Sequence, residues 1–111
     1  MQNRYVGDVG DFGKYGLLRR LVGSNSDERL RLGVIWCLFP NESHNSDGKH
    51  ISYLSGRGGG FRDCDKELYD RLREMLFNET GLIVANRSTV IVESRNILPA
   101  RTVFLQSVTL L

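Results

Sequence analysis

One apolar run decides the fold class of this chain: Val34-Ile35-Trp36-Cys37-Leu38-Phe39. Polar residues precede the run, and Pro40 ends it. A short run that is apolar on both faces, and rich in residues that favour β structure, is typical of a strand buried at the centre of a sheet. Residues 30–39 are therefore predicted to contain such a strand. Trp36 is expected to belong to the core rather than to a surface on which a ligand stacks.

A helix is predicted before this strand, over Asp11–Val22. Its apolar side chains recur at helical spacing, and its cationic ones fall toward the other side. The apolar positions are Phe12, Tyr15, Leu18, Leu21 and Val22. Asp11 is expected to cap the helix, because a carboxylate at that position accepts a hydrogen bond from an unpaired backbone N–H. Gly23 follows where a glycine commonly ends a helix.

A second helix is predicted after the strand, over residues 66–77, with Asp65 as its cap. Its buried stripe is expected to consist of Leu68, Leu72, Met75 and Leu76. Between strand and helix, residues 51–54 are predicted to begin a short helix or strand, and the glycine-rich residues 55–60 a flexible loop.

Two further strands are predicted, over Thr89–Glu93 and Thr102–Leu105. Residues 86–88 would form a hairpin turn after 82–85, or 82–85 would extend the preceding helix. The order helix, strand, loop, helix, strand, strand predicts an α/β or α+β domain, with a small single sheet and two main helices.

Length and composition narrow the class of protein. The 111 residues leave room for a single domain, residues 1–111. No apolar segment reaches the roughly 18 residues of a membrane span, and the first residues lack a secretory signal. Cys37 and Cys64 lie far apart without metal-binding spacing, which favours two reduced thiols in a soluble cytoplasmic protein over a disulfide. The net charge of +2 permits a nucleic-acid partner without requiring one.

The segment that leads into the first helix is rich in glycine and charge. Four glycines lie within residues 7–16, and each costs roughly 1 kcal/mol inside a helix relative to alanine. They indicate either close backbone packing or a backbone that approaches a ligand. Asp8 and Asp11 are suited to bind a cation or an amino group, and Lys14 is suited to meet a phosphate. The alternative is a capped helix packed tightly on a sheet.

A second candidate region follows the predicted central strand. Ligand sites in open α/β sheets favour the carboxyl ends of strands, and residues 41–50 carry several polar donors there. These are Glu42, His44, Asp47 and His50. Their residue types suit a ligand or a metal, but their spacing matches no common zinc signature, so no metal is predicted. The alternative is a solvated loop, in which Asp47-Gly48 forms an ordinary turn.

Two other kinds of site are not favoured. Residues 56–60 lack the third glycine of a dinucleotide-binding loop and the lysine-serine pair of a P-loop, so a simple connection is predicted. His44 and His50 share one loop and neither cysteine has a neighbouring base, so no nucleophilic dyad or triad is predicted.

Several segments resemble known proteins. Residues 4–19, RYVGDVGDFGKYGLLR, together with residues 36–50 and 92–99, resemble a family of uncharacterised bacterial and phage proteins about twice as long as this chain. More distantly, Gly7-Asp8, Asp11 and Lys14-Tyr15 are similar to the G-N-x-x-D-x-x-K-H opening of the ribosomal-RNA adenine methyltransferases.

The methyltransferase resemblance implies a truncated Rossmann-like half. In such a half, the first helix and residues 42–48 would border an S-adenosylmethionine pocket, with Asp11 and Lys14 lining it and Tyr15 at the end of the motif. The sequence departs from the pattern in several ways. Asp8 replaces its asparagine and Tyr15 its histidine, the loop after the strand lacks G-x-G, and no D-P-P-Y-like catalytic motif follows.

Two functions are consistent with these observations. The favoured one is a non-catalytic binding protein without a cofactor, such as an anti-CRISPR inhibitor from a phage or mobile element, with a protein as its main partner and nucleic acid as a further one. The alternative is an enzyme half that binds S-adenosylmethionine or a nucleotide and acts on nucleic acid. Either could form a homodimer through apolar residues near the C-terminus, unless these form an edge strand folded onto their own core. These residues are Val103, Phe104, Leu105, Val108, Leu110 and Leu111.

Overall fold

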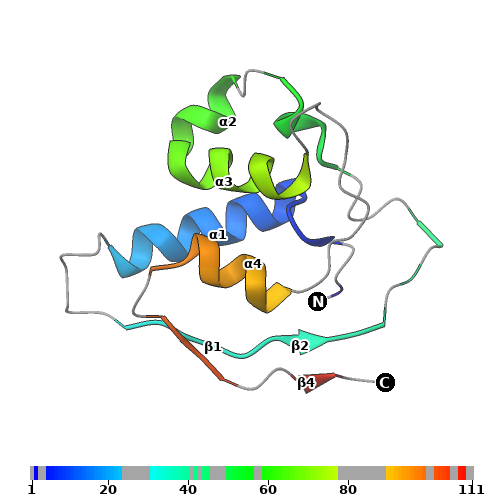
Figure 1. Ribbon diagram of the computed structural model, residues 1–111, viewed down its shortest axis with the longest axis vertical. Helices are drawn as coiled ribbons and strands as arrows, with labels where there is room; N and C mark the ends of the chain where they lie inside the picture. Colours follow the sequence, from blue (N-terminus) through cyan, green and yellow to red (C-terminus); the bar gives the residue numbers. More distant parts are fainter. Residues whose placement is uncertain are drawn as a thin grey trace.

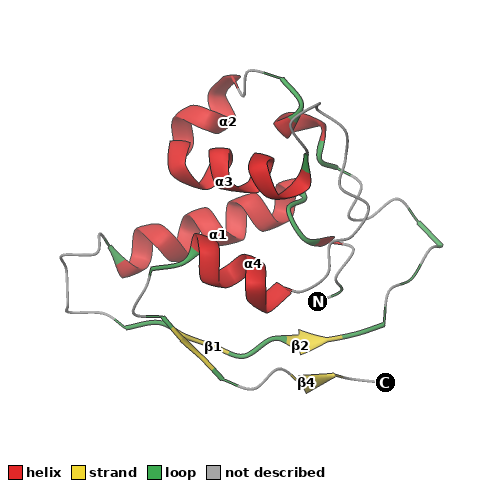
Figure 2. Ribbon diagram, viewed as in Figure 1, coloured by secondary structure: helices red, strands yellow, loops and turns green. Residues whose placement is uncertain are grey.

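The computed structural model of the chain describes residues 2, 5–23, 31–40, 42, 44–45, 50–56, 59–77, 90–99, 102–105 and 108–109. Its elements, in chain order, are α1 (Val9–Val22), β1 (Gly33–Val34), β2 (Cys37–Leu38), η2 (Ser52–Leu54), α2 (Gly59–Cys64), α3 (Lys66–Leu76), α4 (Val90–Ile97), β3 (Val103–Phe104) and β4 (Val108–Thr109). The helices occupy one side of the molecule and the strands the other (Figures 1 and 2). Helices together with short paired strands confirm the α+β class.

Helix α1 begins two residues earlier than predicted, because Asp8 and not Asp11 is its cap. The backbone of Asp8 is extended, and its Oδ1 accepts a hydrogen bond from the backbone N–H of Asp11 at 2.8 Å. Asp11 lies within the first turn, where its side chain points into the protein instead. Gly23 ends the helix as predicted, with a φ of 81° that a residue with a side chain rarely adopts.

The predicted central strand is present as two short strands, β1 and β2, each in a parallel pair. Gly33 and Val34 of β1 pair with Val103 and Phe104 of β3, and Cys37 and Leu38 of β2 pair with Val108 and Thr109 of β4. The two pairings are one residue out of step, since Cys37 lies three positions after Val34 but Val108 lies four positions after Phe104. The prediction of a strand at residues 102–105 is confirmed.

Burial alternates along this segment, so the prediction that it is covered on both faces is wrong. Val34 and Trp36 are buried, whereas Ile35, Cys37 and Phe39 are exposed. The physical reason is that the described helices cover only one side of the strands (Figure 2). Trp36 belongs to the core, as predicted.

Helix α3 is the centre of the helical side, and its prediction is confirmed. Asp65 caps it by accepting a hydrogen bond from the N–H of Leu68 at 3.0 Å. The stripe of Leu68, Leu72 and Leu76 is buried, with Met75 partly buried. The helix contacts α1, α2, α4 and η2.

Two shorter elements precede α3. Residues 52–54 form the short helix η2, one of the two predicted alternatives. The loop predicted over residues 55–60 is wrong at its end, because Gly59 and Gly60 form the first turn of α2. An aromatic cluster joins these elements to α1, with ring centroids 5.2–6.5 Å apart. Its members are Phe12, Tyr53, Phe61 and Tyr69.

Helix α4 replaces the strand predicted over Thr89–Glu93. The β-branched residues there favour a strand locally, but the segment from Val90 onward is helical as far as Ile97. Helical geometry places Ser94, Ile97 and Leu98 in the core beside α1 and α3. Tertiary packing has therefore overridden a weak local preference. The predictions for residues 82–88 lie outside the described residues.

Three further observations concern the described ranges. None of their helices has both the length and the apolar character needed to cross a bilayer. Cys37 and Cys64 are both exposed, and no disulfide joins them. Leu21, predicted on the apolar face of α1, is exposed as well.

Candidate functional site

The structure brings Asp8, Asp11 and Lys14 together at the start of α1. Asp11 is only 2% exposed, and its two carboxylate oxygens have different partners. Oδ2 accepts a hydrogen bond from the backbone N–H of Gly7 at 3.1 Å, and Oδ1 accepts one from Nζ of Lys14 at 2.9 Å. The polar groups of this cluster thus bind one another and hold the first turn of the helix.

Burial dominates the electrostatics of Asp11. Removal of the carboxylate from water raises its pKa above the ordinary value of 3.8, and the nearby charge of Asp8 adds to this. The hydrogen bond and charge of Lys14, together with the Gly7 N–H, act in the opposite direction but do not cancel the effect of burial. Ionisation of the Asp11 carboxyl is therefore costly at this buried position.

Lys14 contacts both Asp11 and Trp36. Its side chain is 42% exposed, and its ammonium group stands over the ring of Trp36, 5.3 Å from the ring centroid. A cation held over the face of a tryptophan is stabilised by the negative face of the ring. Lys14 is thus engaged on two sides, by the Asp11 carboxylate and by Trp36.

Tyr15 is not part of a surface site. It is completely buried, its ring meets that of Trp36 edge to face at 6.2 Å, and its hydroxyl is 3.0 Å from Oγ of Ser94. This hydrogen bond links α1 to α4. Tyr15 therefore contributes to the contact between two helices, and neither Ser94 nor this contact was predicted from the sequence.

The glycines of this segment have separate explanations. Gly7 has a φ of 78°, and a Cβ at that position would collide with Cδ1 of the buried Leu76. Its carbonyl accepts a hydrogen bond from the hydroxyl of Tyr53 at 2.7 Å. Gly16 packs near Leu68, whereas Gly13 faces open space. Of the two explanations that the sequence offered, close packing accounts for Gly7.

Residues 42–50 are only partly joined to this cluster. The backbone carbonyl of His50 accepts a hydrogen bond from the N–H of Val9 at 3.0 Å, which ties the end of the loop to the start of α1. Glu42 and His44 form an exposed pair with 3.1 Å between Oε2 and Nδ1. The side chain of His50 is exposed. Asp47 lies outside the described residues.

Metal-ligating side chains do not converge in the part of the chain that the structure describes. No group of three or more histidine, cysteine, aspartate or glutamate residues there is arranged to hold an ion. The loop pair of Glu42 and His44 supplies two such side chains.

A junction centred on Arg19 was not predicted from the sequence. Its guanidinium donates to Asp65 at 2.7 Å, to Glu67 at 3.0 Å and to the carbonyl of Ile97 at 2.6 Å. Burial alone would lower the pKa of Arg19, but the hydrogen bonds to Asp65 and Glu67 raise it overall. The residues that meet here are 46–78 positions apart in the chain, so no sequence spacing could have indicated the junction.

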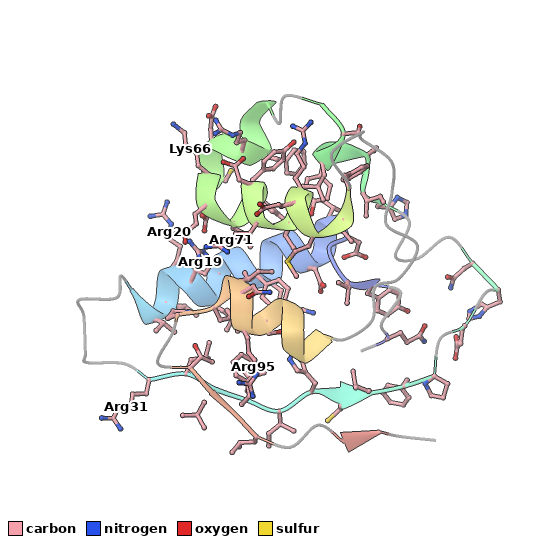
Figure 3. All side chains as sticks on the ribbon, viewed as in Figure 1. Arg19, Arg20, Arg31, Lys66, Arg71 and Arg95 are labelled. Atoms are coloured by element: carbon pink, nitrogen blue, oxygen red, sulfur yellow. The ribbon has the colours of Figure 1, made fainter. Side chains whose placement is uncertain are left out.

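Basic side chains lie on the same side of the view as this junction, with Arg20 and Arg71 beside Arg19 and the others farther away (Figure 3). They are Arg20, Arg31, Lys66, Arg71 and Arg95, all exposed, and we call them the basic side. The sequence shows only Arg19-Arg20 and Arg29/Arg31 as groupings, because the remaining members come from α3 and α4.

Exposed apolar side chains form a second unpredicted feature. On and beside the paired strands, four large ones are 46–54% exposed. They are Ile35, Phe39, Val103 and Leu105, and we call them the strand surface. On α1, Leu17 and Leu21 are exposed to a similar degree. Of the C-terminal residues predicted as an interface, Val103 and Leu105 are exposed and Phe104 is partly buried, while 110 and 111 lie outside the described residues.

The chain matches no protein-family model, no curated protein and no solved structure.

Proposed function

We propose that the chain is a non-catalytic binding protein that uses the strand surface to dock onto a protein of a host nucleic-acid-processing complex. The class of complex we propose is a CRISPR-type nuclease, with the chain acting as an inhibitor from a phage or mobile element. The observation that carries the proposal is the exposure of Ile35, Phe39, Val103 and Leu105 around the strands. Clusters of large exposed apolar side chains mark surfaces that bind other proteins.

The strands add a second reason. Each described strand has one hydrogen-bonded partner, so each two-stranded pair has two outer edges. Edge strands present backbone N–H and C=O groups that a strand of another protein can pair with. Exposed apolar side chains beside strand edges favour a protein partner over a small ligand.

The residues first considered for ligand binding also fit this proposal. Asp8, Asp11 and Tyr15 cap, stabilise and pack α1, and their polar groups are hydrogen-bonded within the protein. A group that serves the fold in this way is costly to redirect to a substrate, because its present partners would lose their hydrogen bonds.

A cleavage assay with a purified CRISPR effector, its guide RNA and a labelled target tests the proposal. The wild-type chain should inhibit cleavage, and the double variant Val103→Ser, Leu105→Ser should not. Leu17→Ser, Leu21→Ser is the matched control, since it removes two side chains of similar exposure from α1, and it should inhibit like the wild type. Inhibition that survives in the strand variant would rule out the strand surface, and no inhibition by the wild type would rule out this class of partner.

The alternative of an S-adenosylmethionine-binding enzyme half has its own test. A ligand at a hundred times its Kd stabilises a protein by about 2.7 kcal/mol, which a thermal-shift measurement detects readily. We expect no rise in Tm with S-adenosylmethionine or with nucleotides. A rise that Lys14→Met abolishes would replace the binding proposal with the enzyme.

A further inference from the structure

We infer that the basic side is a binding surface for the phosphate backbone of a nucleic acid. Its members Arg20, Arg31, Lys66, Arg71 and Arg95 lie on the side of the molecule where Arg19 pairs with Asp65 and Glu67. This surface differs from the strand surface in residues and chemistry, so the inference goes beyond the proposed function and does not depend on it.

Hydrogen bonds connect the elements that carry the basic side. Arg19 ties the last turn of α1 to Asp65 and Glu67 at the start of α3 and to the end of α4. Arg20 is its neighbour on α1, and Lys66 stands between its two acidic partners. The three helices that carry these cationic side chains are thus joined by one partly buried contact.

Two further contacts link the basic side to the strands. The guanidinium of Arg95 stands 5.3 Å from the centroid of the Phe104 ring, which places it over β3. The carbonyl of Leu32 accepts a hydrogen bond from the N–H of Val103 at 2.8 Å, so the segment that carries Arg31 runs beside the same strand. Figure 3 shows the labelled side chains in one half of the view, from α3 above to the segment before β1 below.

The basic side keeps a net positive charge, because its five cations together with Arg19 outnumber the two carboxylates of the junction. Asp65 and Glu67, the carboxylates at the junction, are both hydrogen-bonded to Arg19. Asp70, on the next turn of α3, is paired with Arg62 of α2. Arg20 and Arg71 therefore lie beside acidic groups that other arginines have already engaged.

The composition and layout favour nucleic acid over an acidic protein. Four of the five side chains are arginines, whose planar guanidinium binds phosphate oxygens in a bidentate manner. They extend from the start of α3 to the segment before β1 (Figure 3), in a molecule whose two longer dimensions are 40 and 38 Å, and one turn of B-DNA is about 34 Å long. Nucleic acid presents a regular row of phosphates over such a length, whereas acidic side chains on a protein have no fixed spacing.

Fluorescence anisotropy with a short labelled DNA duplex tests the inference across a range of salt concentrations. The wild-type chain should bind the duplex with an affinity that falls as salt rises. The variant Arg20→Gln, Arg71→Gln should bind on the order of tenfold or more weakly near 0.1 M salt, and its slope of log K against log salt should be smaller by about two. A variant with unchanged affinity and slope would overturn the inference.

Arg73→Gln is the matched control. Arg73 lies on the same helix as Arg71, two positions away and hence about 200° around the axis, and it donates to the carbonyl of Gly56 at 3.0 Å. The control should keep the wild-type slope. Because it removes one charge where the double variant removes two, a change in slope about half as large in the control would mean that only net charge matters. Polyglutamate should not compete with the duplex. Full competition at equal charge concentration would assign the surface to an acidic protein instead.

Discussion

Gly7 and Gly13 stand six positions apart at the start of the chain, yet their surroundings are opposite. Gly7→Ala forces a side chain into a positive φ, at a cost of about 1–2 kcal/mol, and its Cβ displaces the buried Leu76. Gly13→Ala meets nothing within 4 Å on the exposed side of α1 and should stabilise the helix by roughly 0.5–1 kcal/mol. Urea denaturation of the two variants should therefore give changes of opposite sign. A Gly13→Ala variant that is also destabilised would indicate that this helix face is covered in solution.

Asp11 gives a prediction about pH. Burial raises its pKa, so the folded chain holds this proton more tightly than the unfolded chain does. The stability that Asp11 contributes is therefore greatest below its ordinary pKa of 3.8 and is lost as the pH rises through the raised value. An asparagine side chain does not titrate, so the variant Asp11→Asn should gain stability relative to the wild type as the pH increases toward 7.

Urea unfolding of both proteins at several pH values measures this difference. Groups that do not interact with Asp11 titrate alike in the two proteins, so the difference isolates Asp11 together with its neighbours Asp8 and Lys14. If the wild type instead gains stability relative to Asp11→Asn as the pH rises toward 7, then Lys14 and the Gly7 N–H outweigh burial. The direction assigned to the pKa of Asp11 would then be wrong.

At the scale of elements, Arg19 holds three helices together. Lysine retains the charge but is a compact point donor, so Arg19→Lys cannot reach both Asp65 and the carbonyl of Ile97 in the same way. Arg19 is 20% exposed, and we expect the variant to lose about 1–2 kcal/mol of stability. Arg62→Lys is the control, because its pair with Asp70 lies in water and should contribute little. Equal effects in the two variants would show that Arg19 is no more than a surface charge.

The helices also show how far the sequence predicts this fold. The cap and stripe of α3 follow from Asp65 and the leucines, because both signals are local and strong. The start of α1 was misplaced because two aspartates three positions apart can each cap, and only the buried contact of Asp11 with Gly7 distinguishes them. Helix α4 was predicted as a strand, since its side-chain types favour β structure and only its packing against Tyr15 favours a helix.

The candidate site, like the fold, could be predicted from the sequence only in part. The sequence correctly placed Asp8, Asp11 and Lys14 near one another, because they occupy adjacent turns of one helix. It could not show that Asp11 is buried, nor that basic residues from α1, α3 and α4 surround Arg19. Those facts depend on contacts between residues far apart in the chain, and no local pattern carries them.

At the scale of the whole molecule, the strand surface and the basic side meet at β3. Val103 and Leu105 belong to the strand surface, while the ring of Phe104 between them supports Arg95. Side chains alternate across a strand, so substitutions at 103 and 105 leave the contact at 104 in place. The neutral variant Val103→Ser, Leu105→Ser should therefore bind the DNA duplex with the affinity and salt slope of the wild type, even though it no longer docks onto a protein. Anisotropy measured on this variant beside Arg20→Gln, Arg71→Gln decides whether the surfaces act separately. If the serine variant loses duplex binding while its Tm is unchanged, the two surfaces form a single interface that extends across β3, and the protein partner and the nucleic acid would compete for it.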